Sequence, residues 1–135
     1  MRTLAENFAP YTEAKDMKEL GFNDEQTTCF GSFINEKLCL GFFHPTHCTE
    51  DTILAPTYSQ AFDFFRDKYN LRGFIGFRPN VKQFDYHIYD MSLSGKEYVK
   101  QRTMEEYNKD PKVGTYEEAE LECLVKLIEI IKEKK

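Results

Sequence analysis

The clearest hydrophobic pattern of the chain lies at its C-terminal end. Residues Thr115 to Glu118 have the composition of a capping box, in which a threonine hydroxyl accepts a backbone N–H bond and a glutamate reaches back to the cap. Beyond them, apolar residues recur at helical spacing and form a stripe of Leu121, Leu124, Val125, Ile128 and Ile131, widened by Cys123, Leu127 and Ile130. The pattern predicts an amphipathic helix from Thr115 onward, with an apolar face wider than contact with one side of a sheet requires.

Two more helices are predicted upstream by the same spacing. Pro56 suits the first turn of a helix, and the segment after it lines one face with Tyr58, Ala61, Phe62, Phe65 and Tyr69. Asn70 can end this helix, because asparagine tolerates the left-handed cap conformation. A shorter helix is predicted from about Pro10 to Leu20, where Gly21 supplies the stop.

Two hairpins are predicted between the helices. Their strands are placed at Thr28–Ile34, Lys37–Phe43, Phe74–Arg78 and Gln83–Met91. Turn residues join them, Asn35-Glu36 in the first hairpin and Pro79-Asn80 in the second. The last strand alternates between a predicted core face, with Phe84, Tyr86 and Ile88, and the opposite face, with Asp85, His87 and Tyr89.

Together these elements predict an α+β fold in the order α-ββ-α-ββ-α, with a small antiparallel sheet of two hairpins and about three helices packed mainly on one face. A chain of 135 residues suits a single domain, placed here at 1–135. Residues 92–114 hold many charges, two glycines and Pro111, and are predicted to be a variable loop or insertion, or a loose helix around Tyr98–Tyr107. Loops of this length are often functional, so this segment is a candidate cover for a site.

The distribution of charge along the chain indicates which class of partner the protein can bind. The formal net charge is −5, yet residues 66–102 carry eight basic and four acidic side chains. Duplex-binding modules usually carry a concentrated cationic face, so an acidic chain with one basic stretch argues against duplex nucleic acid and favours a small anionic ligand. No segment approaches the roughly 20 apolar residues of a membrane span, and the first ten residues lack the apolar core of a signal peptide. We therefore expect no membrane partner and a cytoplasmic location.

The cysteines and histidines offer the candidates for metal or nucleophilic chemistry. His44, His47 and Cys48 fall within five residues and could present three zinc ligands. The fourth ligand would come from Cys29, Cys39, His87 or Glu50. The alternative is a polar loop in which Pro45 marks a turn. Cys48 and His87 could also act as nucleophile and base, but this chemistry needs an orienting group and an oxyanion hole. We predict no metal, no cofactor, no catalytic residue and reduced cysteines.

Three predicted helical segments carry a resemblance. They are Lys18–Phe22, Leu54–Tyr69 (LAPTYSQAFDFFRDKY) and Thr115–Leu124 (TYEEAELECL). In these segments the chain resembles a family of short uncharacterised proteins from phages and prophages of Bacteroides-type hosts. The resemblance implies a phage protein that acts in the cytosol of its host cell, and it implies no catalytic residues.

The remaining candidate site is a stretch in which basic and aromatic residues are interleaved, from Arg66 to Tyr89. A ring that stacks on a base, beside guanidinium groups that hold phosphate, is a common way to bind a nucleotide. The candidate ligand-binding residues are Arg72, Arg78, Lys82, His87 and Tyr89. The alternative is that many of these rings are core residues and that the charged side chains only make an exposed sheet face soluble.

These observations favour a phage accessory protein that binds a small anionic nucleotide-derived ligand without turning it over. One such role is immune evasion, in which the protein is a sponge that sequesters a host immune signal. The first alternative is an interaction module that docks on a host or phage protein, or on a second copy of the chain, through the wide stripe of the C-terminal helix. The second alternative is a small hydrolase, which has the least support from individual residues.

Overall fold

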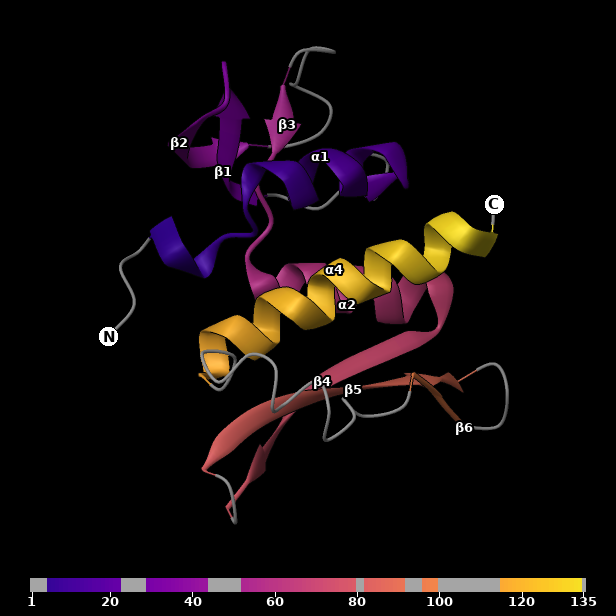
Figure 1. The fold of residues 1–135 in the computed structure, drawn as a ribbon. Coiled ribbons are helices and arrows are strands. Elements are labelled where there is room, and N and C mark those ends of the chain that lie inside the picture. Colours follow the sequence, from indigo (N-terminus) through magenta and orange to yellow (C-terminus); the bar gives the residue numbers. More distant parts are fainter. Residues whose placement is uncertain are drawn as a thin grey trace. The chain divides into compact units, whose positions relative to one another are not determined.

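The computed structural model describes residues 5–22, 29–43, 52–79, 82–91, 96–99 and 115–134 (Figure 1). The elements are η1 (Ala5–Asn7), α1 (Tyr11–Glu19), β1 (Cys29–Ile34), β2 (Lys37–Phe43), β3 (Ile53–Leu54), α2 (Tyr58–Tyr69), β4 (Leu71–Arg78), β5 (Gln83–Asp90), β6 (Lys96–Val99) and α4 (Tyr116–Lys134). They confirm the predicted α+β class and the order α-ββ-α-ββ-α. The two hairpins belong to two antiparallel sheets, with strand orders β2-β1-β3 and β4-β5-β6.

The chain divides into two compact units, residues 1–64 and 65–135, and the boundary falls inside α2. That residues 1–135 form a single domain stays a prediction. Among the described helices, none combines the length and the apolar character that crossing a membrane requires.

The first unit is organised around the β1–β2 hairpin. Asn35 and Glu36 have φ angles of 53° and 65°, which is the backbone of a two-residue hairpin turn whose twist matches the strands it joins. The short strand β3, which the pattern did not predict, pairs with the other side of β1. A buried cluster of Phe8, Ala14, Phe33 and Ala55, with Tyr11, Leu38 and Ile53 packed against it, joins η1, α1 and this sheet.

The ends of α1 and α2 show how far local signals determine the helices. Gly21, just after α1, has a φ of 98°, and Asn70, just after α2, has a φ of 56°, so both adopt the left-handed conformation expected of them. The start of α2 differs from the prediction. Thr57 is the cap: its N–H donates to Gln60 Oε1 at 3.0 Å, and the Gln60 N–H donates to Thr57 Oγ1 at 3.2 Å. This reciprocal capping box satisfies the backbone N–H groups of Thr57 and Gln60. The helix therefore begins after Pro56 and not at it.

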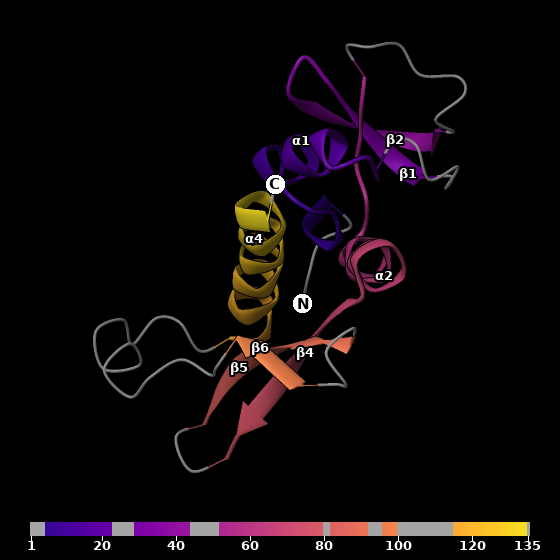
Figure 2. The same ribbon diagram turned by 90° about the vertical axis from the view of Figure 1, so that its right-hand side faces the viewer.

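The second unit is a sheet with α4 on one face. The N–H of Glu118 donates to Thr115 Oγ1 at 3.2 Å, which confirms the predicted cap of this helix. α4 contacts β4 and β5 (Figure 2), and Gly73 lies close to this helix. A Cβ atom at Gly73 would lie 2.7 Å from Cys123 Sγ and 3.3 Å from Leu127 Cδ1. Gly73 therefore faces α4, and β4 can lie against the helix because this position has no side chain.

The face of the sheet toward α4 is the predicted core face. Strand pairing places Gly73 opposite Ile88 and Phe84 opposite Phe77, and the Phe84 ring meets the Tyr116 ring of α4 edge to face at 5.7 Å. Ile88 is fully buried, and Phe84 and Tyr86 are half-buried. The assignment of Phe84, Tyr86 and Ile88 to the packed side of β5 is thus confirmed.

Two strands differ from their predicted extents. β4 begins at Leu71 rather than Phe74, because the left-handed Asn70 turns the chain directly from α2 into the strand. Lys96–Val99 forms β6 and pairs with β5, so Tyr98 and Val99 belong to a strand and not to the expected loop or loose helix. The rest of the 92–114 segment lies outside the described residues.

Candidate ligand-binding face

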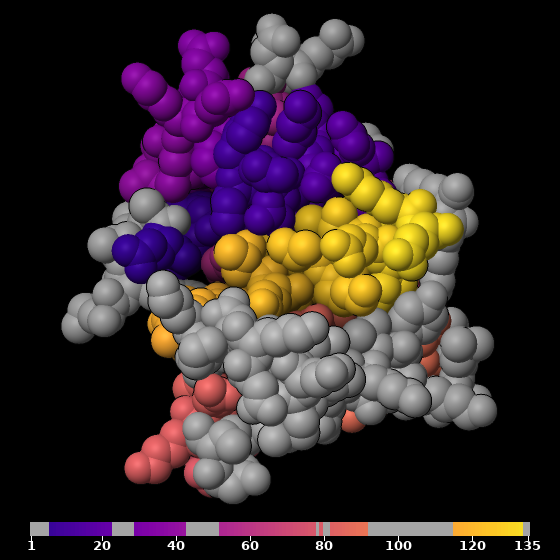
Figure 3. All heavy atoms as spheres, in the orientation of Figure 1, coloured from indigo at the N-terminus to yellow at the C-terminus, as the bar shows by residue number. Residues whose placement is uncertain are grey.

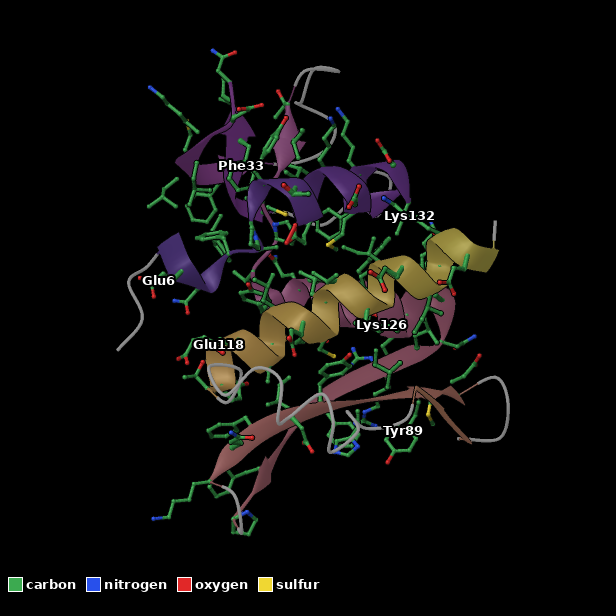
Figure 4. All side chains as sticks on the ribbon, viewed as in Figure 1. Glu6, Phe33, Tyr89, Glu118, Lys126 and Lys132 are labelled. Carbon is green, nitrogen blue, oxygen red and sulfur yellow. The ribbon has the colours of Figure 1, made fainter. Side chains whose placement is uncertain are left out.

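The candidate site is the side of β4 and β5 that points away from α4. The register pairs Arg72 with Tyr89, Phe74 with His87, Gly76 with Asp85, and Arg78 with Gln83. Directly paired residues of antiparallel strands project to the same side of a sheet, and these pairs alternate with those that face α4. We call the set of Arg72, Phe74, Gly76, Gln83, Asp85, His87 and Tyr89 the outer face. Figure 4 shows Tyr89 on the side of the sheet opposite α4.

Aromatic rings occupy the middle of the outer face. Phe74 stacks on His87 with a centroid distance of 5.2 Å and an interplanar angle of 20°, and on Tyr89 with 5.4 Å and 6°. Phe74 is 42% exposed to solvent. Three nearly parallel rings at a partly exposed surface present flat apolar faces, which is the arrangement that accepts a nucleobase by stacking.

A cation lies at one end of these rings. Arg72 is exposed and is the cross-strand neighbour of Tyr89. A guanidinium beside a stacking ring can hold a phosphate while the ring holds the base. The structure therefore brings together three of the predicted residues: Arg72, His87 and Tyr89.

The other two predicted residues lie at the far end of the hairpin. Arg78 ends β4 and pairs with Gln83, and Lys82 is exposed just before β5 with a φ of 52°. At about 3.4 Å of rise per residue, the backbones of Arg78 and Arg72 are ~20 Å apart along the strand. The structure does not join Arg78 and Lys82 to the ring cluster.

An acid–imidazole pair adjoins the rings. His87 Nε2 lies 3.3 Å from Asp85 Oδ1, and Asp85 is only 2% exposed. A Cβ atom at Gly76 would come within 2.8 Å of Asp85 Oδ1 and 3.2 Å of His87 Nε2. The space above Gly76 is thus taken up by this pair.

Sequence reasoning missed Phe74, Asp85 and Gly76 as parts of the site. The signal for Phe74 is the hairpin register: once Arg78 pairs with Gln83, Phe74 must face His87. Gly76 gives no signal in the sequence, because its role depends on the neighbouring strand. No pattern along the chain reveals that Asp85 is buried.

The described residues give no support to the predicted zinc site or to the Cys48–His87 nucleophile pair. The cluster His44, His47 and Cys48 lies outside the described residues, as does the Cys48 half of the Cys48–His87 pair. Within the described ranges, no three His, Cys, Asp or Glu side chains are grouped to hold a metal ion. The described cysteines, Cys29, Cys39 and Cys123, are not joined in disulfides. Burial, with a smaller effect of Glu120, raises the pKa of the Cys123 thiol to about 12, so this thiol stays neutral and unreactive.

The apolar stripe predicted as a docking surface is largely buried. Leu124, Leu127, Ile128 and Ile131 of α4 are each almost fully covered, and Val125 is its exposed member. A different apolar surface is exposed on the first unit. The β1–β2 hairpin exposes Phe30, Ile34, Leu40 and Phe42. Figure 3 shows atoms of this hairpin, in purple, at the surface of the molecule. Phe42 is 81% exposed, and its ring meets the Phe30 ring at 5.3 Å.

Comparison with known proteins gives no match to this chain, whether by family model, by curated protein or by solved structure. The resemblance to short phage proteins therefore stays a prediction. The geometry of the outer face carries the functional argument.

Proposed function

We propose that the protein binds a small anionic nucleotide-derived ligand on the outer face of β4 and β5, without turning it over. The observation that carries this proposal is the Phe74 ring, which stacks on both His87 and Tyr89 beside the exposed Arg72. In this arrangement a base stacks on the rings and a phosphate binds the Arg72 guanidinium. Stacking of one base on an aromatic side chain contributes about 1–3 kcal/mol, and a hydrogen bond to a charged group about 1.5–3 kcal/mol.

The biological setting of the proposal comes from the resemblance to phage proteins. In that setting the protein acts in the cytosol of the host cell, and the ligand is an immune signal such as a cyclic dinucleotide or an ADP-ribose derivative. Sequestering this signal would let the phage escape a host defence. The proposal assigns no catalytic role, so the ligand is expected to be released unchanged.

The direct test is a thermal-shift panel of cyclic di-AMP, cyclic GMP–AMP, ADP-ribose and cyclic ADP-ribose, with adenosine as the uncharged control. A ligand present at a hundred times its Kd adds about 2.7 kcal/mol to the free energy of unfolding. We expect ADP-ribose to raise the melting temperature and adenosine to raise it less. Arg72→Gln should weaken ADP-ribose binding by about tenfold or more, because it removes a charge-assisted contact. A panel that leaves the melting temperature unchanged would contradict the proposal.

Mass spectrometry of the bound ligand separates a binder from a hydrolase. ADP-ribose incubated with the protein and then recovered should keep its mass. A time-dependent loss of that mass, absent from the Arg72→Gln variant, would instead support the hydrolase.

A second candidate function is docking on another protein through the β1–β2 hairpin. Its specific support is the exposed Phe30–Phe42 ring pair, since contiguous exposed apolar residues often mark interaction sites. A second copy of the chain is the occupant that can be tested without knowing another partner. If the hairpin joins two copies, sedimentation velocity should show a dimer that Phe42→Ser converts to monomer. A wild-type monomer at high concentration would rule out self-docking.

A further inference from the structure

We infer that Asp85 is a positioning residue that sets the orientation of His87 in the ligand site, and that glycine at position 76 makes this contact sterically possible. The inference rests on the proposed function, since His87 is taken as a ligand-contacting residue. It extends that function by two residues that would not themselves touch the ligand.

The first support is the contrast in burial between the two partners. Asp85 is 2% exposed, and the His87 side chain, 14% exposed, is the more accessible member of the pair. A buried carboxylate is stabilised by a hydrogen-bonding or charged partner, because burial without one is costly. Asp85 Oδ1 lies 3.3 Å from His87 Nε2, so the imidazole is one such partner.

The second support is that two different contacts constrain the His87 ring. Phe74 stacks on its face at 5.2 Å, which sets the plane of the ring. Asp85 lies at its Nε2 edge, which selects one of the two ring orientations related by a flip about the Cβ–Cγ bond and favours a proton on Nε2. A histidine held by a carboxylate in this way has a defined tautomer and orientation, as in metal sites where a carboxylate accepts the N–H of a ligating histidine.

The third support is the space at Gly76. This residue lies opposite Asp85 in the strand register, and a Cβ atom there would be 2.8 Å from Asp85 Oδ1 and 3.2 Å from His87 Nε2. Contacts under 3 Å require atoms to move, so any residue other than glycine would displace the carboxylate from the imidazole. The glycine is needed for space, and not for an unusual backbone conformation.

The test compares Asp85→Asn and Gly76→Ala with Asp67→Asn, which removes a carboxylate that is 69% exposed on α2. With ADP-ribose as the probe in isothermal titration calorimetry, Asp85→Asn and Gly76→Ala should each raise Kd by about tenfold, as loss of an outer-shell partner does elsewhere. Asp67→Asn should leave Kd within a factor of two. Equal affinity in wild type and Asp85→Asn would overturn the inference.

A double-mutant cycle separates positioning from a general loss of structure. Once His87 is replaced in His87→Gln, adding Asp85→Asn should weaken binding no further, because the residue to be positioned is gone. A further tenfold loss in the double variant would show that Asp85 acts on the fold rather than through His87.

A readout without ligand distinguishes failure of this inference from failure of the proposed function. The ¹⁵N chemical shifts of the His87 ring should indicate a proton on Nε2 in the wild type and should change in Asp85→Asn. If ADP-ribose does not bind but these shifts behave as expected, the ligand proposal is wrong and the Asp85–His87 coupling holds. Unchanged shifts in Asp85→Asn would overturn the coupling itself.

Discussion

Phe74→Ala is expected to weaken the binding of ADP-ribose by about 5- to 150-fold, the range that corresponds to losing 1–3 kcal/mol of stacking. The reason is that Phe74 stacks on both His87 and Tyr89, so its removal takes away one ring and releases two others from their common orientation. Isothermal titration calorimetry measures this loss. The melting temperature should fall only slightly, because Phe74 is 42% exposed.

The matched control is Phe77→Ala on the same strand. Phe77 is 53% exposed, much like Phe74, but it packs on Phe84 on the side of the sheet toward α4. Its removal should leave the Kd for ADP-ribose within a factor of two. If Phe77→Ala and Phe74→Ala weakened binding equally, the effect would be a general one of apolar truncation and the outer face would lose its special role.

Gly73→Ala is expected to lower the free energy of unfolding by about 1–3 kcal/mol, which is typical of overpacking in a core. The added Cβ would lie 2.7 Å from Cys123 Sγ and 3.3 Å from Leu127 Cδ1, so the methyl group forces core side chains of α4, or the helix itself, to move. Urea denaturation measures the change.

Removal of the opposing sulfur should relieve this clash. In Gly73→Ala/Cys123→Ala the new methyl group occupies space that the thiol has left, so the double variant should be more stable than the sum of the two single losses predicts. Strict additivity of the two losses would mean that β4 and α4 do not meet at Gly73, and the assignment of the outer face as the side away from α4 would fail with it.

The parts of the fold that could be predicted from the sequence are those with a local cause. The Thr115 cap and the left-handed Asn70 are each determined by one residue and its neighbours. The turn at Asn35-Glu36 needs only the two strands that flank it. The start of α2 lies at Tyr58 and not at Pro56, because Thr57 and Gln60 form a reciprocal capping box whose spacing is present in the sequence.

The parts that could not be predicted depend on contacts between segments far apart in the chain. β3 has two residues and β6 has four, which are too few for an alternating pattern to be recognised. β3 forms by pairing with β1, and β6 forms by pairing with β5.

The candidate site was predicted only in part, because it too depends on contacts between separate strands. β5 alternates clearly, so His87 and Tyr89 could be assigned to one face. β4 reads Leu-Arg-Gly-Phe-Ile-Gly-Phe-Arg without alternation, so Phe74 and Gly76 could not. The spread of charge along the chain suggested that Arg78 and Lys82 share a site with Arg72, whereas the register separates them by the length of β4.

The most direct test of the outer face as a ligand site is a ¹⁵N NMR titration of the full chain with ADP-ribose. We expect the largest shifts on the backbone amides of Arg72, Phe74, His87 and Tyr89, and no shift of the amides of the β1–β2 hairpin. The opposite pattern, with shifts confined to the β1–β2 hairpin or none at saturating ADP-ribose, would contradict the account.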